Sequence, residues 1–402
     1  MRASIFSALL LCCFYLASTF AREVPLLHYD SSTRIEGEYI VVLRSSLTAD
    51  DVTRHMEHLA KEFAQSQGGL EGNKFLHGAF NIGSLKGFSV RLSQDLLAKQ
   101  RAHPNVSYVE VNQVVSLNQD QCVDQPSVLW NLDRISETLL DLDGHYIYHS
   151  SSGEGVTVYV IDTGIQVAHD DFQGRASWGW AFDGDESDGN GHGTHVSSTV
   201  GGVQWGVAKK VSLVAVKVLN AGGSGTTAGV IGGIDWVTNA HSSGTSTLSV
   251  ANMSLGGGKS AALVSAVENS VAAGVTYAVA AGNDNRDACN YSPADAPSAI
   301  TVGATTSEDD RSSFSNWGTC VDIFAPGTTI TAAWIGANDA LRTISGTSMA
   351  SPHVAGAAAI VLGRNPTYTP KEVKDSLVNG CTSNVLRNVG TGSPNCLLYT
   401  SC

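Results

Sequence analysis

Between positions 38 and 118 the spacing of the apolar residues alternates between the strand period and the helix period. This alternation predicts a small α+β domain. The segment at 50–63 places four apolar side chains at helical spacing, namely Val52, Met56, Leu59 and Phe63. A second helix begins at Ser93 and ends before Pro104. The predicted elements are strands at 38–43, 80–92 (two short strands) and 106–117 and helices at 50–63 and 93–104. This β-α-β-β-α-β order is ferredoxin-like, and such a domain alone could be a binding module, an inhibitor or a chaperone.

From residue 155 onward the pattern is different. Apolar strands without strict alternation are expected at 155–162, 211–219, 250–255, 274–283 and 299–305. Helical segments lie between them at 225–241 and 260–274, the second with Leu263, Val264, Val267 and Val271 on one face. Apolar strands that alternate with helices predict an α/β fold, a doubly wound and mostly parallel sheet covered on both faces. Ligands of such sheets bind at the carboxyl ends of the strands.

The first 21 residues have the layout of a secretory signal peptide. Arg2 precedes an apolar run from Ile5 to Leu16, and small residues follow before residue 22. A membrane anchor is the alternative, but the run is short for a spanning helix. Removal of residues 1–21 leaves six of the eight cysteines, an even number that permits disulfides in an exported chain. A polar stretch at 118–127 then separates the small domain from the rest.

Charge narrows the classes of partner. The formal net charge is −13, and residues 122–402 hold 13 Lys and Arg against 25 Asp and Glu. This acidity argues against nucleic-acid binding and allows cations to bind. The hydrophobic share of 43% permits a large core, and 42 glycines against 10 prolines indicate many tight turns.

Three glycine-rich segments carry candidate chemistry. Asp162 ends a predicted strand (VTVYVIDTG), His195 lies where a loop becomes a helix (NGHGTHV), and Ser348 lies at a helix start (SGTSMASPH). A serine hydroxyl becomes a nucleophile when a base takes its proton and a carboxylate fixes that base. Each residue alone could instead be a helix cap or a core side chain. His192 forms an H-x-x-H pair with His195 that could bind a metal, but no third ligand is evident, and we assign it a local structural part.

Taken together, the three segments resemble the subtilisin-like serine proteases, in which Asp, His and Ser follow in this order. The blocks YVIDTGI, NGHGTHV, NMSLGGG, AVAAGND and SGTSMASPHVAG match in sequence order within residues 129–363. Further blocks are similar to the proteinase K branch, and to aqualysin-type enzymes in particular. The resemblance implies an inhibitor-type propeptide with a ferredoxin-like domain at 22–118 and a peptidase domain at 119–402.

The resemblance also implies a role for individual residues. Asp162, His195 and Ser348 would form the catalytic triad, and Asn283 would donate to the oxyanion. The substrate-binding residues would be three short segments, Gly223-Ser224-Gly225, Ser254-Leu255-Gly256 and Ala280-Ala281-Gly282. The first resembles an edge that pairs with extended peptide, and the other two would form the walls of a pocket. These small, uncharged walls suit apolar side chains before the cut.

Metal sites and disulfides are likewise implied by the resemblance. A structural calcium would bind the Asp322 carboxylate and the carbonyls of Pro297 and Ala299, since calcium prefers several hard oxygen ligands. Two further acidic clusters are candidates, one of Asp133, Glu137 and Asp143 and one of Asp183, Asp185 and Asp188. The resemblance implies the disulfide Cys289–Cys320. Cys381–Cys396 is a further candidate pair, which would leave Cys122 with Cys402, but the sequence leaves the pairing of these four cysteines open. One disulfide of aqualysin-like enzymes is absent, because Asp188 or Gly189 and Asn220 or Ala221 occupy its positions.

The predicted function is that of a secreted serine endopeptidase of broad apolar preference. It would act on proteins and peptides as a monomer, with its own propeptide as inhibitor and without nucleic-acid or membrane partners. It would be made as a zymogen that cuts itself near residues 117–123. The alternative is a subtilase-fold binding protein that keeps its propeptide. A nucleotide-binding protein is disfavoured, since the first strand of the sheet lacks a glycine fingerprint after it.

Overall fold

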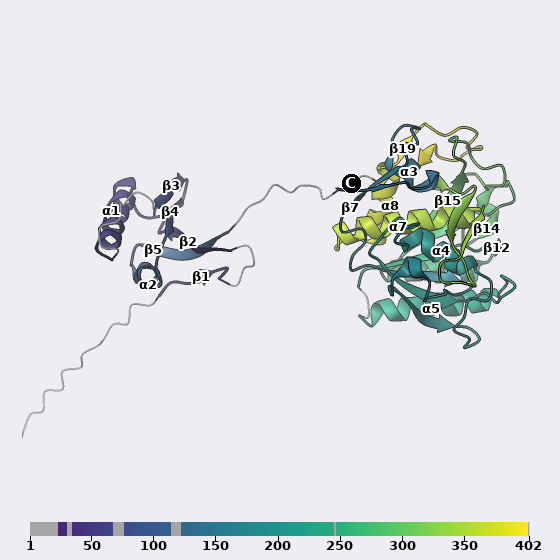
Figure 1. Cartoon of the computed structure of the whole chain (residues 1–402), viewed down its shortest axis with the longest axis horizontal. Coiled ribbons are helices and arrows are strands. Elements are labelled where there is room, and N and C mark those ends of the chain that lie inside the picture. Colours follow the sequence, from purple (N-terminus) through teal and green to yellow (C-terminus); the bar gives the residue numbers. More distant parts are fainter. Residues whose placement is uncertain (1–22, 30–33, 67–75, 114–121, 245–246, 401) are drawn as a thin grey trace, which may run out of the picture. The chain divides into compact units, whose positions relative to one another are not determined.

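The computed structural model describes residues 23–29, 34–66, 76–113, 122–244, 247–400 and 402 (Figure 1). The chain divides between Gln119 and Asp120 into two compact units, which we describe separately. The predicted signal peptide and the predicted cleavage region up to residue 121 lie outside the described residues.

The N-terminal unit has the predicted β-α-β-β-α-β order with one short strand added. Its elements are β1 (Leu26–Leu27), β2 (Arg34–Leu43), α1 (Ala49–Ser66), β3 (Leu76–Ile82), β4 (Leu85–Arg91), α2 (Gln94–Ala102) and β5 (Val106–Gln113). The sheet order β1-β5-β2-β4-β3 is antiparallel except that β1 runs parallel to β5. Ser93 caps α2, as the sequence predicts. Leu59 of α1 and Phe88 of β4 are fully buried in the common core, so the helical and strand patterns face one another.

The second unit is built on a sheet of nine strands in its described part, in the order β19-β20-β16-β15-β13-β11-β8-β10-β9. Neighbouring strands are parallel except for β19 against β20. The strands are β8 (Thr157–Asp162), β9 (Ala176–Ala181), β10 (Ser212–Lys217), β11 (Ser249–Met253), β13 (Thr276–Ala280), β15 (Ile300–Thr305), β16 (Ile323–Pro326), β19 (Thr382–Ser383) and β20 (Cys396–Leu397). The mostly parallel α/β fold is thus confirmed.

Helices cover both faces of this sheet (Figure 1). In β8, Val158 and Val160 join one core cluster, whereas Tyr159 and Ile161 join the other. Both faces are therefore apolar, which explains why the strand sequences lack polar alternation. The helices are α3 (Trp130–Ser136), α4 (His192–Gly201), α5 (Thr227–Ser242), α6 (Ala261–Ala272), α7 (Thr347–Arg364) and α8 (Pro370–Asn379), with 3₁₀ turns at Asp170–Phe172 and Ala288–Asn290.

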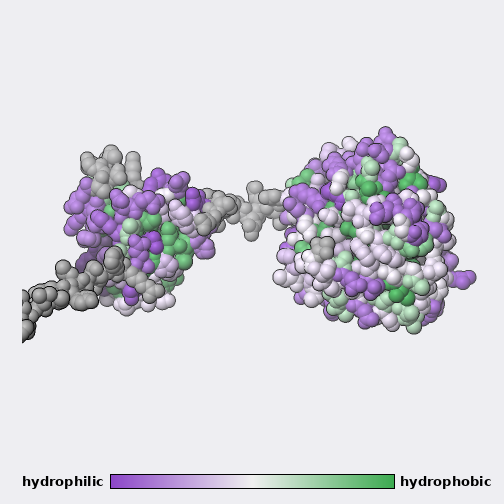
Figure 2. Space-filling model, turned by 90° about the horizontal axis from the view of Figure 1, so that it is seen from below, coloured by the Kyte–Doolittle hydropathy of each residue, from purple (hydrophilic) through white to green (hydrophobic). Residues whose placement is uncertain are grey.

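Short two-stranded pairs complete the unit. These are β6 (Cys122–Pro126) with β7 (His145–His149), β12 (Gly257–Gly258) with β14 (Tyr291–Ser292), and β17 (Ile330–Ala333) with β18 (Leu341–Ile344). On the face shown in Figure 2, apolar residues of this unit are scattered among polar ones. Within the described ranges, no helix combines the length and the apolar character that a membrane span requires.

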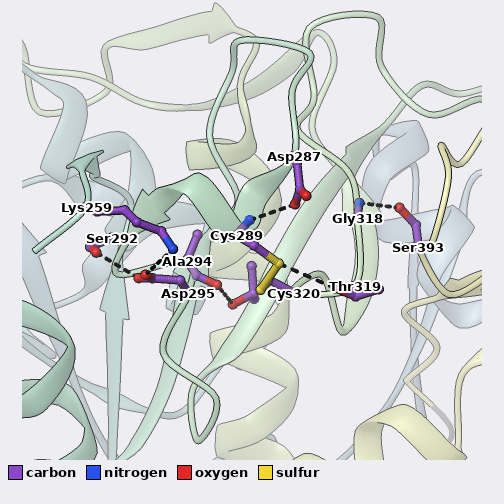
Figure 3. Close-up of a disulfide and its surroundings, with 11 residues drawn as sticks. Lys259, Asp287, Cys289, Ser292, Ala294, Asp295, Gly318, Thr319, Cys320 and Ser393 are labelled. Carbon is purple, nitrogen blue, oxygen red and sulfur yellow. Dashed lines mark hydrogen bonds and ion pairs between the residues drawn. A yellow bond between two sulfur atoms is a disulfide. The ribbon is translucent and has the colours of Figure 1, made fainter. Parts of the chain in front are cut away.

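The cysteines of the second unit form three disulfides in the described part of the chain, and Cys289–Cys320 is the pair that the resemblance implies. The disulfides are Cys122–Cys402, Cys289–Cys320 and Cys381–Cys396. Figure 3 shows the Cys289–Cys320 bond, where the Cys289 N–H donates to Asp287 Oδ1 at 2.9 Å. Beside it, the Gly318 N–H donates to Ser393 Oγ at 2.8 Å, so the C-terminal segment is fixed to the same loops.

Replacing Cys289 and Cys320 together by serine is expected to destabilise the second unit. The bond spans 31 residues, and its loss should cost about 3–4 kcal/mol in the chain-entropy model. Denaturant unfolding of the wild type and of the variant measures the change. The doubly substituted Cys381/Cys396 variant, which opens 15 residues, should lose less. An unchanged midpoint in the Cys289/Cys320 variant would contradict the expectation.

Candidate active site

The carboxyl end of β8 is the point where the strand order of the sheet reverses. Strands β9 and β10 lie on one side of β8, whereas β11 and all later strands lie on the other. Such a switch point leaves a crevice above the strand ends. Asp162 is the last residue of β8 and is fully buried. Its Oδ1 accepts hydrogen bonds from the Thr163 N–H and from His192 Nδ1, both at 2.8 Å.

The structure corrects the predicted histidine, because His192 and not His195 contacts Asp162. His195 lies one turn further along α4 and is fully buried. Its Nε2–H points to the carbonyls of Ile330 and Arg342, at 3.1 Å each, in the β17–β18 pair. His195 is therefore a core residue that joins α4 to this hairpin. Burial lowers the pKa of His195 to about 4, so it remains neutral and is a weak base.

Two neighbouring carboxylates change the protonation of His192. Burial disfavours its charged form, but the charge of Asp162, their hydrogen bond and the charge of Asp188 outweigh that effect and raise the pKa of His192. Because Nδ1–H donates to Asp162, Nε2 is left as the proton acceptor. A quarter of the side chain, 24%, is exposed, so this nitrogen is accessible.

Asp188 organises the loop that places His192, a role that the sequence analysis missed. Its Oδ1 accepts from Thr163 Oγ1 at 2.9 Å and from the Gly191 N–H at 2.8 Å. Its Oδ2 accepts from the N–H and the hydroxyl of Thr194, at 3.0 and 2.6 Å. The carboxylate thus has its donors within the protein and is buried. It does not fit the predicted metal cluster with Asp183 and Asp185, because its lone pairs are already used.

Gly191 allows α4 to begin at His192. Its φ of +98° is accessible to glycine but costly for other residues. A Cβ at this position would also lie 2.5 Å from the ring of Trp334. Gly191 of the NGHGTHV segment therefore permits the sharp turn from the loop into α4 at the edge of the sheet.

Ser348 is the second residue of α7, which places it at the helix start as predicted. Its hydroxyl donates to the Ser254 carbonyl at 3.1 Å, and Ser254 Oγ donates back to the Ser348 carbonyl at 2.7 Å. The hydrogen bond from Ser254 Oγ to the Ser348 carbonyl is explained by the backbone of α7. Pro352 lies four residues after Ser348 and has no N–H, so the Ser348 carbonyl lacks its usual helical donor and Ser254 replaces it.

Two hydrogen-bond donors flank a small space beside Ser348. Asn283 Oδ1 accepts from the N–H and the hydroxyl of Thr347, at 2.8 and 2.9 Å, which leaves the amide Nδ2 on the other side. The Ser348 N–H has no acceptor in the described part of the chain. A Cβ added to Gly346 would lie 3.5 Å from Ser348 N and 3.7 Å from Asn283 Nδ2. Glycine at 346 therefore leaves open a position that both donors can reach.

The predicted substrate residues line two cavities that share Leu255 and Gly256. The first, of about 450 Å³, contains His192, Gly223, Ser224, Gly225 and Ser254 in its walls. The second, of about 390 Å³, is lined by Ala280, Ala281, Gly282, Asn283 and Ser348. The predicted substrate segments thus line these two cavities, the first with His192 and the second with Ser348 in its wall.

The predicted calcium ligands Asp322, Pro297 and Ala299 also come together, but around a lysine. Lys374 Nζ donates to the carbonyls of Pro297 and Ala299 at 3.0 and 2.7 Å and pairs with Asp322 Oδ1 at 2.9 Å. Burial raises the pKa of Asp322, and the lysine charge partly opposes that shift. A divalent ion does not fit among these oxygens while the ammonium is bound to them.

The second predicted cluster has a different environment. Carboxylate oxygens of Asp133, Glu137 and Asp143 lie within 4.8 Å of one another. Asp133 is 2% exposed, and its Oδ1 has no hydrogen-bond partner among the described residues. Burial first, and then the neighbouring carboxylates, raise the pKa of Asp133 and Glu137. This acidic group therefore fits a cation.

Along the chain, a buried aspartate, the histidine hydrogen-bonded to it and a serine at a helix start follow in the Asp, His, Ser order of subtilisin-type serine hydrolases. Residues 153–392 match the subtilase family, and residues 38–118 match the family described as peptidase inhibitor I9. The chain belongs to the subtilase family and is a subtilisin-like serine endopeptidase with an I9 propeptide domain.

Relatives from several organisms share most of the chain. Identity is 47% to an extracellular serine proteinase of Thermus sp. (strain Rt41A), over 94% of this chain and 93% of that protein. Identity is 46% to alkaline serine exoprotease A of Vibrio alginolyticus, over 91% of this chain and 68% of that protein. A solved structure of a cold adapted subtilisin-like serine proteinase is 51% identical, covers 68% of this chain and 98% of its own, and has a TM-score of 0.64.

Substitution of the two histidines should separate their roles. We expect His192→Ala to lower kcat by about 10⁶-fold, the scale of loss when the base of such a triad is removed. His195→Gln should lower the melting temperature but keep most of kcat, because His195 contacts core carbonyls. In the wild type and in His195→Gln, kcat/KM should fall as pH falls through the raised pKa of His192, since the neutral imidazole is the base. If His195→Gln lost kcat and His192→Ala kept it, this assignment would be contradicted.

Proposed function

We propose that Asp162, His192 and Ser348 form the catalytic triad of this endopeptidase. The observation that carries the proposal is the 2.8 Å hydrogen bond between His192 Nδ1 and the buried Asp162 carboxylate. This bond fixes the tautomer in which Nε2 accepts the proton of Ser348 as its oxygen attacks the peptide carbonyl. The protonated His192 then donates to the leaving amine. Water, activated by the same nitrogen, hydrolyses the acyl-enzyme.

The oxyanion of each tetrahedral intermediate would be bound beside Gly346. The Ser348 N–H and Asn283 Nδ2 are the donors, and both flank the space that the missing side chain leaves open. The first turn of α7 adds the positive end of a helix dipole. Loss of one such side-chain donor in this kind of site typically lowers kcat by about 10²–10³-fold.

The substrate would bind as an extended strand along Gly223-Ser224-Gly225. The N–H groups of Gly223 and Ser224 and the Ser224 carbonyl bond to Asn220 in this exposed loop, so the backbone of Gly225 would carry the β-augmentation. The side chain before the cut would enter the cavity lined by Ala280, Ala281 and Gly282, which contains no basic residue and one acidic residue, Asp284. An apolar preference follows, without a strong selection among apolar residues. The exposed and uncharged edge gives no reason for a narrow choice of sequence.

The enzyme would be exported as a monomeric zymogen. Residues 1–21 have the pattern of a signal peptide, and the Thermus relative is described as extracellular. The I9 match at 38–118 supports inhibition by the propeptide. We propose self-cleavage near residues 117–123, where Leu117 is an apolar residue that the pocket can accept. The relatives named above are described as proteinases, and no finding favours the binding-protein alternative.

Ser348→Ala should block maturation. We expect it to accumulate, after signal removal, as a precursor larger than the wild-type product, because the attacking oxygen is absent. The mature N-terminus, read by mass spectrometry in a wild-type culture, locates the cut. A serine-directed fluorophosphonate should label secreted wild type and leave Ser348→Ala unlabelled. Normal maturation of Ser348→Ala expressed alone would disprove self-cleavage, and an unlabelled wild type would disprove the free enzyme.

We propose that calcium binds the cluster of Asp133, Glu137 and Asp143 and stabilises the fold. The unpartnered Oδ1 of buried Asp133 is the supporting observation. Asp133 lies in α3, Glu137 and Asp143 follow it, and none of the three contacts a residue of the triad among the described residues, so the ion would take no part in the chemistry. When bound, it would neutralise carboxylates that otherwise repel one another.

Chelation is expected to lower the melting temperature of the inactivated mature enzyme and to leave initial turnover unchanged. The loss arises because a bound ion stabilises the folded state by RT ln(1 + [Ca²⁺]/Kd). Glu137→Gln should reduce the response to chelation, whereas Asp141→Asn, outside the cluster, should retain it. If Glu137→Gln responds to EDTA as strongly as the wild type, this cluster is not the site.

A further inference from the structure

Lys374 provides a cation to oxygen atoms that converge from two segments of the second unit, the turn at 297–299 and Asp322. Its ammonium makes contacts of 2.7–3.0 Å with the carbonyls of Ala299 and Pro297 and with the Asp322 carboxylate. An ammonium has three N–H donors, and these three acceptors use all of them. The side chains of Lys374 and Asp322 are 19% and 25% exposed, so the contacts are largely removed from solvent.

The acceptors are held in place independently of the lysine. Asp322 Oδ2 accepts from the Thr301 N–H at 2.9 Å, and the Asp322 N–H donates to the Thr301 carbonyl at 2.9 Å. Pro297 and Ala299 belong to the turn that leads into β15, and Asp322 immediately precedes β16. The oxygens therefore lie at the amino ends of two parallel strands, at the edge opposite the active site. A cation here joins this edge to helix α8.

We propose that the Lys374 ammonium permanently replaces a metal ion at this position, so that the β15–β16–α8 junction requires no dissolved calcium. The ammonium neutralises the single Asp322 charge. A divalent ion at the same three oxygens would meet a positive charge at contact distance, so the two cations exclude each other. Because the lysine is part of the chain, its local concentration does not fall on dilution or chelation.

The same helix offers a matched control. Lys371 lies three residues before Lys374 in α8, is exposed, and pairs with Asp375 within the helix. Lys371→Met removes the same charge and the same type of side chain as Lys374→Met. It leaves the contacts of Lys374 with Pro297, Ala299 and Asp322 in place. Differences between the two variants therefore report the junction and not the net charge of the helix.

The test counts bound calcium in mature enzyme inactivated with a fluorophosphonate. After equilibration with CaCl₂ at about 1 mM, within the range of weak protein sites, and removal of free ion, we expect Lys374→Met to bind one calcium more than the wild type. The double variant Lys374→Met, Asp322→Asn should return to the wild-type number, and Lys371→Met should not change it. In EDTA, Lys374→Met should melt about 5 °C lower than the wild type, since one partner of a largely buried ion pair is missing. Added calcium should restore most of that loss.

Asp322→Asn alone keeps the test decisive if Lys374→Met fails to fold. With Lys374 present, the proposal requires that Asp322→Asn bind as many calcium ions as the wild type. The loss of one ion in this variant would overturn the proposal, as would an equal number in wild type and folded Lys374→Met. Calcium at the Asp133 cluster contributes equally to all of these variants and cancels in the comparison.

Discussion

The buried charge of Asp162 is the constraint on which the active-site architecture depends. A fully buried carboxylate is costly unless it is paired and hydrogen-bonded. His192 and the Thr163 N–H supply those bonds at the end of β8. They can do so because Asp188 binds both Thr163 and the start of α4, so the strand end and the helix start are fixed to one another. The geometry of the base is thus set by a second carboxylate that does not contact it.

Much of this could be predicted from the sequence, but not which histidine contacts Asp162. The apolar strands and the Asp, His, Ser order identify the sheet, its carboxyl edge and the family. His192 and His195 occur in the same motif, and their spacing does not show which one faces Asp162. The β17–β18 hairpin determines the orientation of His195, because its carbonyls at 330 and 342 accept hydrogen bonds from that ring. That contact joins residues more than a hundred positions apart, which local patterns cannot reveal.

The same limit applies to cations. Asp322, Pro297 and Ala299 do form the expected oxygen cradle, but Lys374 lies about fifty residues further along the chain. A sequence pattern can indicate which oxygens would bind a metal ion. It does not show that a distant lysine side chain binds the same oxygens. The two acidic sites of this unit therefore differ in kind. One is neutralised from within the chain, and the other, around Asp133, has an oxygen without a partner in the described structure.

The Cys122–Cys402 bond gives the second unit an unusual covalent topology for an enzyme exposed to its own activity. With a sequence separation of 280 between the bonded cysteines, nearly the whole unit is a closed ring. A chain end that frays presents an extended segment, which is the form that a protease accepts. Here the disulfide holds residues 122 and 402 to one another. A single internal cut would open the ring without releasing a fragment, so a piece of this ring can leave only after two cuts.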